Sequence, residues 1–224
     1  FLDGTKSALE MAAISNATLL TPPPNGLQFP PAGMDHLSHI LRPKDNGGVL
    51  EFSGTVEVVS SLERDGRPVA NDLRWGVYVV LEAENDYAAR CFKQYGMNTD
   101  DTGRYSSMFK PFHLIGMELN TSIYSVGILK KATGYTKSFL GDVIATAKQN
   151  LKKGQILDGE GGFTAWGKLY QSETSKKIRG LPIGLANGVK LKKDVSKDQP
   201  ISWSDVEIDL NCPVVKIREK ISLS

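Results

Sequence analysis

SMFKPFHLIGMELNTSIYSVGILKKAT, residues 107–133, opens with aromatic and cationic side chains and continues into the longest helical pattern of the sequence. On a helical wheel, the mostly apolar positions of this pattern share one face. They are Ile115, Leu119, Ser122, Ile123, Val126 and Leu129, with Glu118 at the edge and Lys130, Lys131 and Gly134 at the end. The segment predicts a core helix with a polar entrance, and the rest of the chain is interpreted around it.

The expected start of this helix carries Lys110, Pro111 and His113. A helix N-terminus presents unpaired N–H groups and a partial positive charge, so cations there are unfavourable unless an anion is close. One interpretation is a solvated lysine and a packing histidine. The other is an entrance that binds a substrate phosphate or carboxylate.

The N-terminal run FLDGTKSALEMAAISNAT predicts a helix from Lys6 to about Asn16, capped by Asp3 or Thr5. Lys6 lies in the first turn, where the helix dipole again disfavours a cation. Its aliphatic stem could simply cover apolar surface. The alternative is a second anion contact, similar in kind to the one at Lys110.

Residues 21–48 are proline-rich and predict an irregular loop with one short helix at residues 35–41. Residues 49–62 and 72–83 alternate like strands around an Asp65-Gly66 turn, which predicts an antiparallel hairpin. Residues 85–96 predict a short helix that ends at Gly96.

The polar loop after Gly96 brings Arg104 and Tyr105 into the approach to Lys110 and His113. Two cations, a phenol and an imidazole form a suitable set for holding an oxyanion and moving a proton. Their spacing does not show that they converge.

Residues 138–151 predict a strand, and the residue pattern of the sequence changes near residues 148–151. Beyond that point short apolar pieces alternate with glycine and charge, which indicates a small all-β unit. The fold class is therefore α+β: a domain of helices with a mixed or antiparallel sheet at 1–150, followed by a small all-β domain at 151–224. The GEGG run at 159–162 is interpreted as a turn, because it lacks the context of a phosphate-binding loop.

Composition narrows the function classes. The formal net charge of +2 weighs against a nucleic-acid partner, and the sequence has no apolar run long enough for a membrane span. Cys91 and Cys212 are expected to be reduced thiols in a cytoplasmic protein, and the spacing of His36 and His39 is a poor metal signal. The sequence begins at Phe1 without a secretory pattern, so we expect a piece cut from a longer protein.

No dinucleotide fingerprint, P-loop, Gly-x-Ser-x-Gly elbow or Cys/His nucleophile pattern occurs in the sequence. From the residues alone, the chain is a two-part α+β protein with a candidate anion site.

Three long runs in order carry a resemblance: FLDGTKSALEMAAISNAT, VEVVSSLERDGRPVANDLRWGVYVV and FKPFHLIGMELNTSIYSV. Together they resemble the region after the nucleotide-binding domain in homoserine dehydrogenase-like reductases that end in a SAF domain. That group includes enzymes similar to 1-deoxy-D-xylulose 5-phosphate reductoisomerase, which act in isoprenoid precursor synthesis.

Residues 151 to about 209 resemble the SAF domain, which has a β-clip fold. The matching pieces are Lys153-Gly154-Gln155, residues 181–185 (LPIGL), residues 189–195 (VKLKKDV) and residues 203–206 (WSDV). Where sialic acid synthases have Arg-Pro, this chain has Leu181-Pro182, so their ligand contact does not carry over.

The resemblance implies an NAD(P)H-dependent oxidoreductase whose Rossmann domain, with the cofactor site, precedes this chain. The chain would then be a fragment that is inactive alone and supplies substrate-binding residues and subunit contacts in a homo-oligomer. Lys6, Lys110 and His113 are the catalytic candidates, and Arg104 and Glu118 are candidate contacts to a small anionic substrate. A reductoisomerase reaction would suit a divalent metal, for which the sequence shows no ligand set. The alternative is a non-catalytic, SAF-containing module for binding or oligomerisation.

Overall fold

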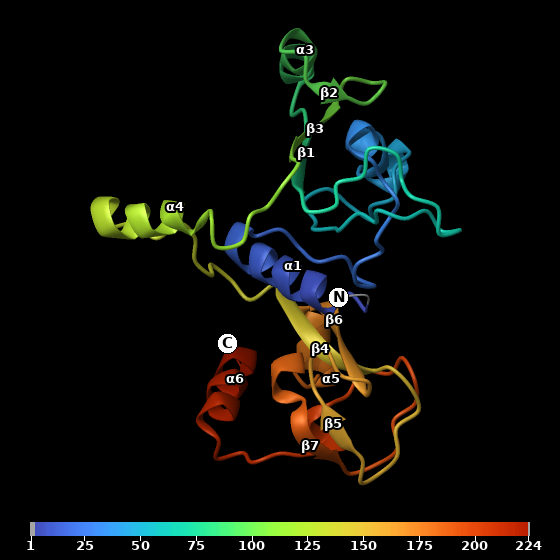
Figure 1. Cartoon of the computed structure of the whole chain (residues 1–224), viewed down its shortest axis with the longest axis vertical. Coiled ribbons are helices and arrows are strands. Elements are labelled where there is room, and N and C mark those ends of the chain that lie inside the picture. The colour runs from blue at the N-terminus through green and yellow to red at the C-terminus, as the bar shows by residue number, and fades with distance from the viewer. Residues whose placement is uncertain (1–2, 224) are drawn as a thin grey trace. The chain divides into compact units, whose positions relative to one another are not determined.

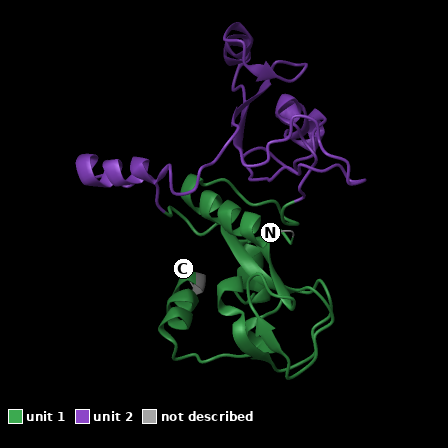
Figure 2. Ribbon diagram, viewed as in Figure 1, with its two compact units in different colours: residues 1–27, 136–224 green, residues 28–135 purple. Residues whose placement is uncertain are grey.

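The computed structural model describes residues 3–223, which fall into two compact units (Figure 2). Unit 1 contains residues 1–27 and 136–224, and unit 2 contains residues 28–135. The structure therefore divides the chain differently from the boundary expected near residue 150, which lies inside unit 1. The reason is that the N-terminal helix packs on strands from the C-terminal half of the sequence.

Unit 1 is built from helices and short antiparallel strands (Figure 1). In chain order they are α1 (Thr5–Thr18), β4 (Gly141–Ala147), β5 (Ile156–Asp158), β6 (Ala165–Gln171), α5 (Ser172–Ile178), β7 (Asn187–Leu191), β8 (Val206–Glu207) and α6 (Pro213–Leu223). Two 3-10 turns at 183–185 and 203–205 complete the set. The predicted N-terminal helix, the strand within 138–151 and the short strands after 151 are confirmed, whereas α5 and α6 were not predicted.

The sheets of unit 1 are antiparallel. β4 pairs with β6 along its whole length, from Gly141 opposite Gln171 to Ala147 opposite Ala165. A second sheet has the strand order β5-β7-β8. Every residue of β4 is buried. The large apolar side chains that are fully buried in unit 1 include Ile144, Leu151, Leu157, Leu169, Leu181, Leu191, Ile201 and Val206.

Polar contacts attach α1 to this sheet. The Asn16 side chain accepts hydrogen bonds from the N–H groups of Leu140 (2.7 Å) and Gly141 (2.9 Å) and donates one to the Gly141 carbonyl (3.0 Å). At the other end of the helix, the Thr5 hydroxyl accepts a hydrogen bond from the Gly167 N–H at 2.8 Å. A Cβ at Gly167 would lie 3.0 Å from the Thr5 methyl group, so glycine permits this close approach.

Unit 2 combines a small sheet with short helices and long loops. Its elements are a 3-10 turn at 34–36, α2 (Leu37–Ile40), a 3-10 turn at 44–46, β1 (Val77–Glu82), α3 (Asp86–Gln94), β2 (Asn98–Thr99), β3 (Tyr105–Lys110), α4 (Leu119–Tyr124) and the π-helix η3 (Ser125–Leu129). The strand order β1-β3-β2 is antiparallel throughout. The predicted short helix within 35–41 and the predicted helix ending before Gly96 are confirmed.

The core of unit 2 lies under one face of this sheet. Ala32, Leu37, Leu41 and Leu73 are buried there, and Tyr78 and Val80 of β1 pack against them. The opposite face of β1 carries Val77 and Val79, which are exposed.

The predicted hairpin between residues 49–62 and 72–83 forms only at its tip, where the Val69 N–H donates to the Ser61 carbonyl at 2.9 Å across the Asp65-Gly66 turn. β1 lies in the second of these segments, but it pairs with β3, with Val79 opposite Met108. Among the described residues, 49–62 forms only isolated bridges, one of them between Leu62 and Pro68 across the expected turn. The alternating sequence thus indicated an extended segment. It did not indicate the pairing partner of β1, which is β3 and lies further along the chain.

The predicted core helix over 107–133 is wrong in two respects. Its first part is strand β3, and Pro111 follows that strand without an N–H to extend the ladder. Gly116, at φ +84°, interrupts helical geometry, so α4 begins only at Leu119. No residue of α4 or η3 is buried, and Leu119, Ile123, Val126 and Leu129 are between 57 and 63% exposed.

Candidate functional site

Three of the candidate residues meet in unit 2 between the end of β3 and the start of α4. Lys110 is the last residue of β3 and not a helix N-terminal residue, which corrects that prediction. Its ammonium forms an ion pair with Glu118 and lies 5.2 Å from the centre of the Phe112 ring. Nδ1 of His113 lies 3.3 Å from a Glu118 carboxylate oxygen. Lys110 and His113 therefore converge on one carboxylate.

Glu118 organises this cluster. Besides Lys110 and His113, its carboxylate accepts a hydrogen bond from the Leu114 N–H at 3.2 Å. Glu118 also occupies the N-cap position of α4, where a negative charge is favourable. The loop 111–117 is thus closed onto the helix start by one side chain.

The arrangement suits proton transfer. A carboxylate that holds Nδ1–H of an imidazole fixes its tautomer and leaves Nε2 to exchange a proton with a ligand. The His113 side chain is 49% exposed, so a small molecule can reach it. Nearby, Lys110 supplies a positive charge for an anionic group.

Arg104 lies elsewhere in unit 2. It precedes β3, whereas Lys110 ends that six-residue strand, which spans about 20 Å. The Arg104 guanidinium donates to Asp86 at 2.9 Å and to the Ala83 carbonyl at 3.2 Å. The structure therefore does not bring Arg104 to the His113 cluster.

Lys6 lies in unit 1, in the first turn of α1 as predicted. Its ammonium is 3.3 Å from Glu10, one helical turn further along, and the side chain is 43% exposed. The N-cap residue of α1 is Gly4 and not Asp3 or Thr5, as had been expected, although the Asp3 carboxylate accepts a hydrogen bond from the Thr5 N–H at 3.0 Å.

Sequence reasoning missed a buried ionic centre in unit 2. Arg42 forms an ion pair with Asp100, whose side chain is fully buried. Burial alone would raise the pKa of Asp100, but hydrogen bonds from the Tyr105 N–H and from Thr102, together with the Arg42 charge, lower it below its ordinary value. The Tyr105 hydroxyl donates to Glu82 at 2.9 Å. Residues 42 and 100 are far apart in the sequence, so local patterns gave no signal for this pair.

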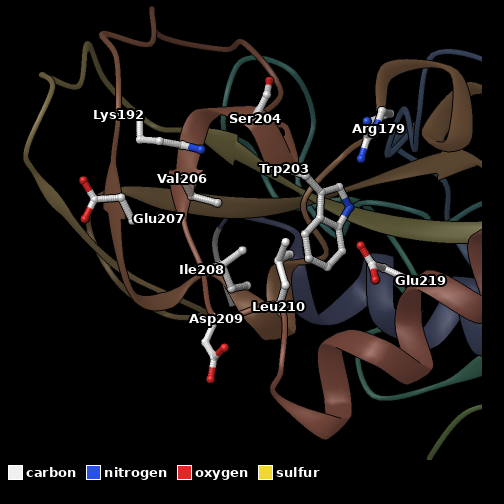
Figure 3. Close-up of a pocket in the computed structure, with 10 residues that line it drawn as sticks. All are labelled: Arg179, Lys192, Trp203, Ser204, Val206, Glu207, Ile208, Asp209, Leu210 and Glu219. Atoms are coloured by element: carbon white, nitrogen blue, oxygen red, sulfur yellow. The ribbon is translucent and has the colours of Figure 1, made fainter.

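The structure also shows a hollow of about 530 Å³ in unit 1 (Figure 3). The Trp203 indole forms part of its wall, with Ile208 and Leu210 beside it and the charged side chains of Arg179 and Glu219 nearby. Cations and carboxylates are mixed along the remaining rim. This balance of charge does not select an anionic ligand.

Two other kinds of functional feature are absent from the described part of the chain. Among residues 3–223, no group of His, Cys, Asp and Glu side chains is arranged to hold a metal ion. Within the same residues, no helix has the length and apolar character to cross a membrane.

Two known protein families match this chain. The family described as oxidoreductase DRL, catalytic domain, matches residues 1–119, which is more than half of the 224 residues. The SAF domain matches residues 142–207, which confirms the resemblance to a SAF domain but begins nine residues before the expected start at residue 151. A search of curated proteins found no match to this chain. The chain is thus an oxidoreductase-type protein: it belongs to the family of the oxidoreductase DRL catalytic domain and carries a SAF domain in its C-terminal part.

Proposed function

We propose that this chain forms the substrate-holding part of an NAD(P)H-dependent oxidoreductase that acts on a small anionic carbonyl compound. The match to the oxidoreductase catalytic domain ends at Leu119, so it includes Lys6, Arg104, Lys110, His113 and Glu118. Resemblance to homoserine dehydrogenase-like and deoxyxylulose phosphate reductoisomerase-like enzymes favours a phosphorylated or amino-acid-derived substrate.

The observation that carries this proposal is the His113–Glu118 pair. Reduction of a carbonyl ends with a proton on its oxygen, and a positioned imidazole is the usual donor at neutral pH. A Glu118 carboxylate oxygen lies 3.3 Å from Nδ1 of His113, so Nε2 is the ring nitrogen that is left to act as the acid. Such a general acid contributes about 100-fold or more to a rate.

Lys110 and Lys6 are the candidates for binding the anionic group of the substrate. Lys110 lies on the same carboxylate as His113, so its ammonium can attract a substrate phosphate while it keeps Glu118 in place. Lys6 remains a candidate from the sequence, in unit 1. Arg104 is the weakest candidate, because two groups of unit 2 already accept hydrogen bonds from its guanidinium.

A nicotinamide cofactor supplies a hydride when it is bound. The residues described here do not fit a dinucleotide site, because all pairings between named strands are antiparallel and no glycine-rich turn links a strand to a helix. The proposal therefore assigns only substrate-side groups to this chain, and no step through a metal is derived.

A thermal-shift titration tests the proposal. A ligand that binds only the folded state raises the melting temperature as its concentration exceeds the dissociation constant. We expect deoxyxylulose phosphate or another sugar phosphate to raise it at matched ionic strength, and Lys110→Met to abolish the rise. Lys153→Met, at an exposed lysine of unit 1, is the matched control. If no sugar phosphate and no homoserine shifts the melting temperature, substrate holding by this chain is refuted.

One observation favours the alternative, a non-catalytic binding module. The candidate cations are paired within the chain: Lys6 with Glu10, Lys110 with Glu118 and Arg104 with Asp86. Those pairs are partly exposed and worth little, so an anionic ligand can compete with them. Binding of a phosphosugar that depends on Lys110 separates the two functions, because a module without a substrate site would not show it.

A further inference from the structure

We propose that the hollow beside Trp203 in unit 1 binds a small zwitterion, an α-amino acid with an aromatic or apolar side chain. The volume of this hollow, about 530 Å³, lies within the range of roughly 300–1,000 Å³ that is typical of ligand pockets. All of its lining residues belong to unit 1, whereas the His113–Glu118 pair belongs to unit 2. The inference therefore does not depend on the proposed reaction.

Two opposite charges without a partner lie at one end of the hollow. In Figure 3 the Trp203 indole lies between the Arg179 guanidinium and the Glu219 carboxylate. Within residues 3–223, the side chains of Arg179 and Glu219 form no ion pair and no hydrogen bond, with each other or with another group. Elsewhere in unit 1, Lys193 is paired with Asp205 at 2.6 Å. A ligand that carries both a carboxylate and an ammonium would satisfy both free charges at once.

The backbone that carries two of these side chains is fixed before any ligand binds. The Arg179 carbonyl accepts a hydrogen bond from the Trp203 N–H at 3.0 Å, which joins the end of α5 to the 3-10 turn at 203–205. A capping box closes this turn, in which the Ser202 N–H donates to the Asp205 carboxylate at 2.8 Å. A site that is already formed loses less conformational entropy when the ligand binds.

Helix α6 holds Glu219 in place through the residues next to it. Arg218 forms an ion pair with Asp142 of β4, and both side chains are largely buried. The Arg218 guanidinium also lies 4.9 Å from the centre of the Phe139 ring. Val215, one turn earlier, is 1% exposed. One side of α6 is therefore anchored on unit 1, while Glu219 lies on an exposed side and lines the hollow.

The apolar wall accounts for the side chain of the ligand. Trp203 presents a flat indole, with Ile208 and Leu210 beside it. Leu210 is 57% exposed, so a ligand side chain that covers it removes apolar surface from water. An aromatic ring can pack on the indole in an offset or edge-on arrangement, which favours phenylalanine as the probe.

The complete lining disfavours a ligand with charge of a single sign. It contains two cationic and three anionic side chains, because Lys192, Glu207 and Asp209 join Arg179 and Glu219. A purely anionic ligand would meet more carboxylates than cations. A purely cationic ligand would leave the Arg179 guanidinium without a partner and repel it. Both arrangements select against the singly charged compounds.

A fluorescence titration of the full chain with L-phenylalanine tests the site. The chain has three tryptophans, and we expect the response to come from Trp203, so Trp203→Phe should remove it although Trp75 and Trp166 remain. For a ligand of this size, the dissociation constant should be on the order of 0.1–1 mM. Phenylpropionate, which lacks the ammonium, and phenylethylamine, which lacks the carboxylate, should each bind at least about 10-fold more weakly.

Substitutions at the two free charges locate the ligand groups. Arg179→Met should weaken phenylalanine binding at least about 10-fold and leave phenylethylamine binding unchanged, because that amine has no carboxylate. Glu219→Gln should likewise weaken phenylalanine binding and leave phenylpropionate binding unchanged. Lys177→Met is the control, because Lys177 is an exposed cation near the end of α5 that does not line the hollow.

The comparison of the three compounds on wild type does not depend on the folding of any variant, and circular dichroism checks the fold of each variant. Equal affinity of wild type for the three compounds overturns the proposal. So does phenylalanine binding that survives both Arg179→Met and Glu219→Gln. The absence of a response at about 10 mM phenylalanine, well above the expected dissociation constant, also overturns it.

Discussion

Replacement of Asp3 by asparagine should remove a pH-dependent contribution to stability in unit 1. The Asp3 carboxylate lies 2.7 Å from the Lys148 ammonium and accepts the Thr5 N–H at 3.0 Å. Burial alone would raise the pKa of Asp3, but the Lys148 hydrogen bond and charge and the Thr5 N–H outweigh it and lower the pKa from 3.8 to about 2. The contact joins the start of α1 to the segment after β4.

The lowered pKa sets the sign and size of the effect. A carboxyl group with a lowered folded-state pKa stabilises the protein above its unfolded pKa, and the contribution disappears as the pH falls through the folded value. A pKa change from 3.8 to about 2 corresponds to about 2 kcal/mol at neutral pH. Water screens the side chain, which is 21% exposed, so we expect about 1–2 kcal/mol.

Urea unfolding of wild type and Asp3→Asn between pH 7 and about pH 2 measures this contribution. The variant should be less stable by about 1–2 kcal/mol at pH 5–7, and the difference should shrink below about pH 4. Lys148→Met should show a similar loss at neutral pH. Asp45→Asn, at an exposed carboxylate, is the control. Equal stability of Asp3→Asn and the control at pH 7, or a difference that persists at pH 2, would refute the reasoning.

Three further substitutions test a buried ion pair, a buried hydrogen bond and the apolar core of unit 2. Arg42→Met leaves the buried Asp100 carboxylate without its cation and should cost about 3 kcal/mol by urea unfolding; a cost below about 1 kcal/mol would contradict a buried pair. Thr5→Val removes the acceptor of the Gly167 N–H and should cost about 1–2 kcal/mol, whereas unchanged stability would show that the bond is dispensable. Leu37→Ala, at a fully buried position of the unit 2 core, should cost about 3 kcal/mol in the same assay, and a loss within about 0.5 kcal/mol would place it outside the core.

The sequence predicted those elements whose signals are local. The N-terminal helix has a run of helix formers, and the helix before Gly96 has Asn85 as a cap, whose side chain accepts the Ala88 N–H at 3.0 Å. The irregular proline segment and the SAF domain were likewise readable from composition and short motifs. In these cases the deciding residues lie within a few positions of one another.

The failures concern long-range pairing and burial. Residues 49–62 alternate like a strand, yet β1 pairs with β3, because pairing depends on the packing of Tyr78 and Val80 on a core from distant segments. Periodicity along residues 107–133 indicated one apolar helix face, but within that segment only residues 119–129 are helical, and their apolar side chains are exposed. Whether a neighbour covers such a face depends on tertiary or quaternary contacts, which the local pattern does not contain.

For the candidate site, the sequence predicted the residue types and the structure supplied their grouping. Lys110, His113 and Glu118 meet because β3 ends and α4 begins around one loop. Arg104 and Lys110 were expected to belong to one approach, but six residues in a strand separate them by far more than six residues in a helix do. The number of residues between Arg104 and Lys110 therefore gave no distance between their side chains until the secondary structure was known.

The most direct test of the central claim is NADPH-dependent reduction of a small phosphorylated ketone by the complete enzyme that the proposal implies, with its NAD(P)H-binding domain, compared between wild type and His113→Gln. The proposed role of His113 as proton donor predicts a fall of about 100-fold in kcat with little change in KM. Wild-type turnover that His113→Gln leaves unchanged would contradict the assignment of the His113–Glu118 pair as the acid at the substrate site.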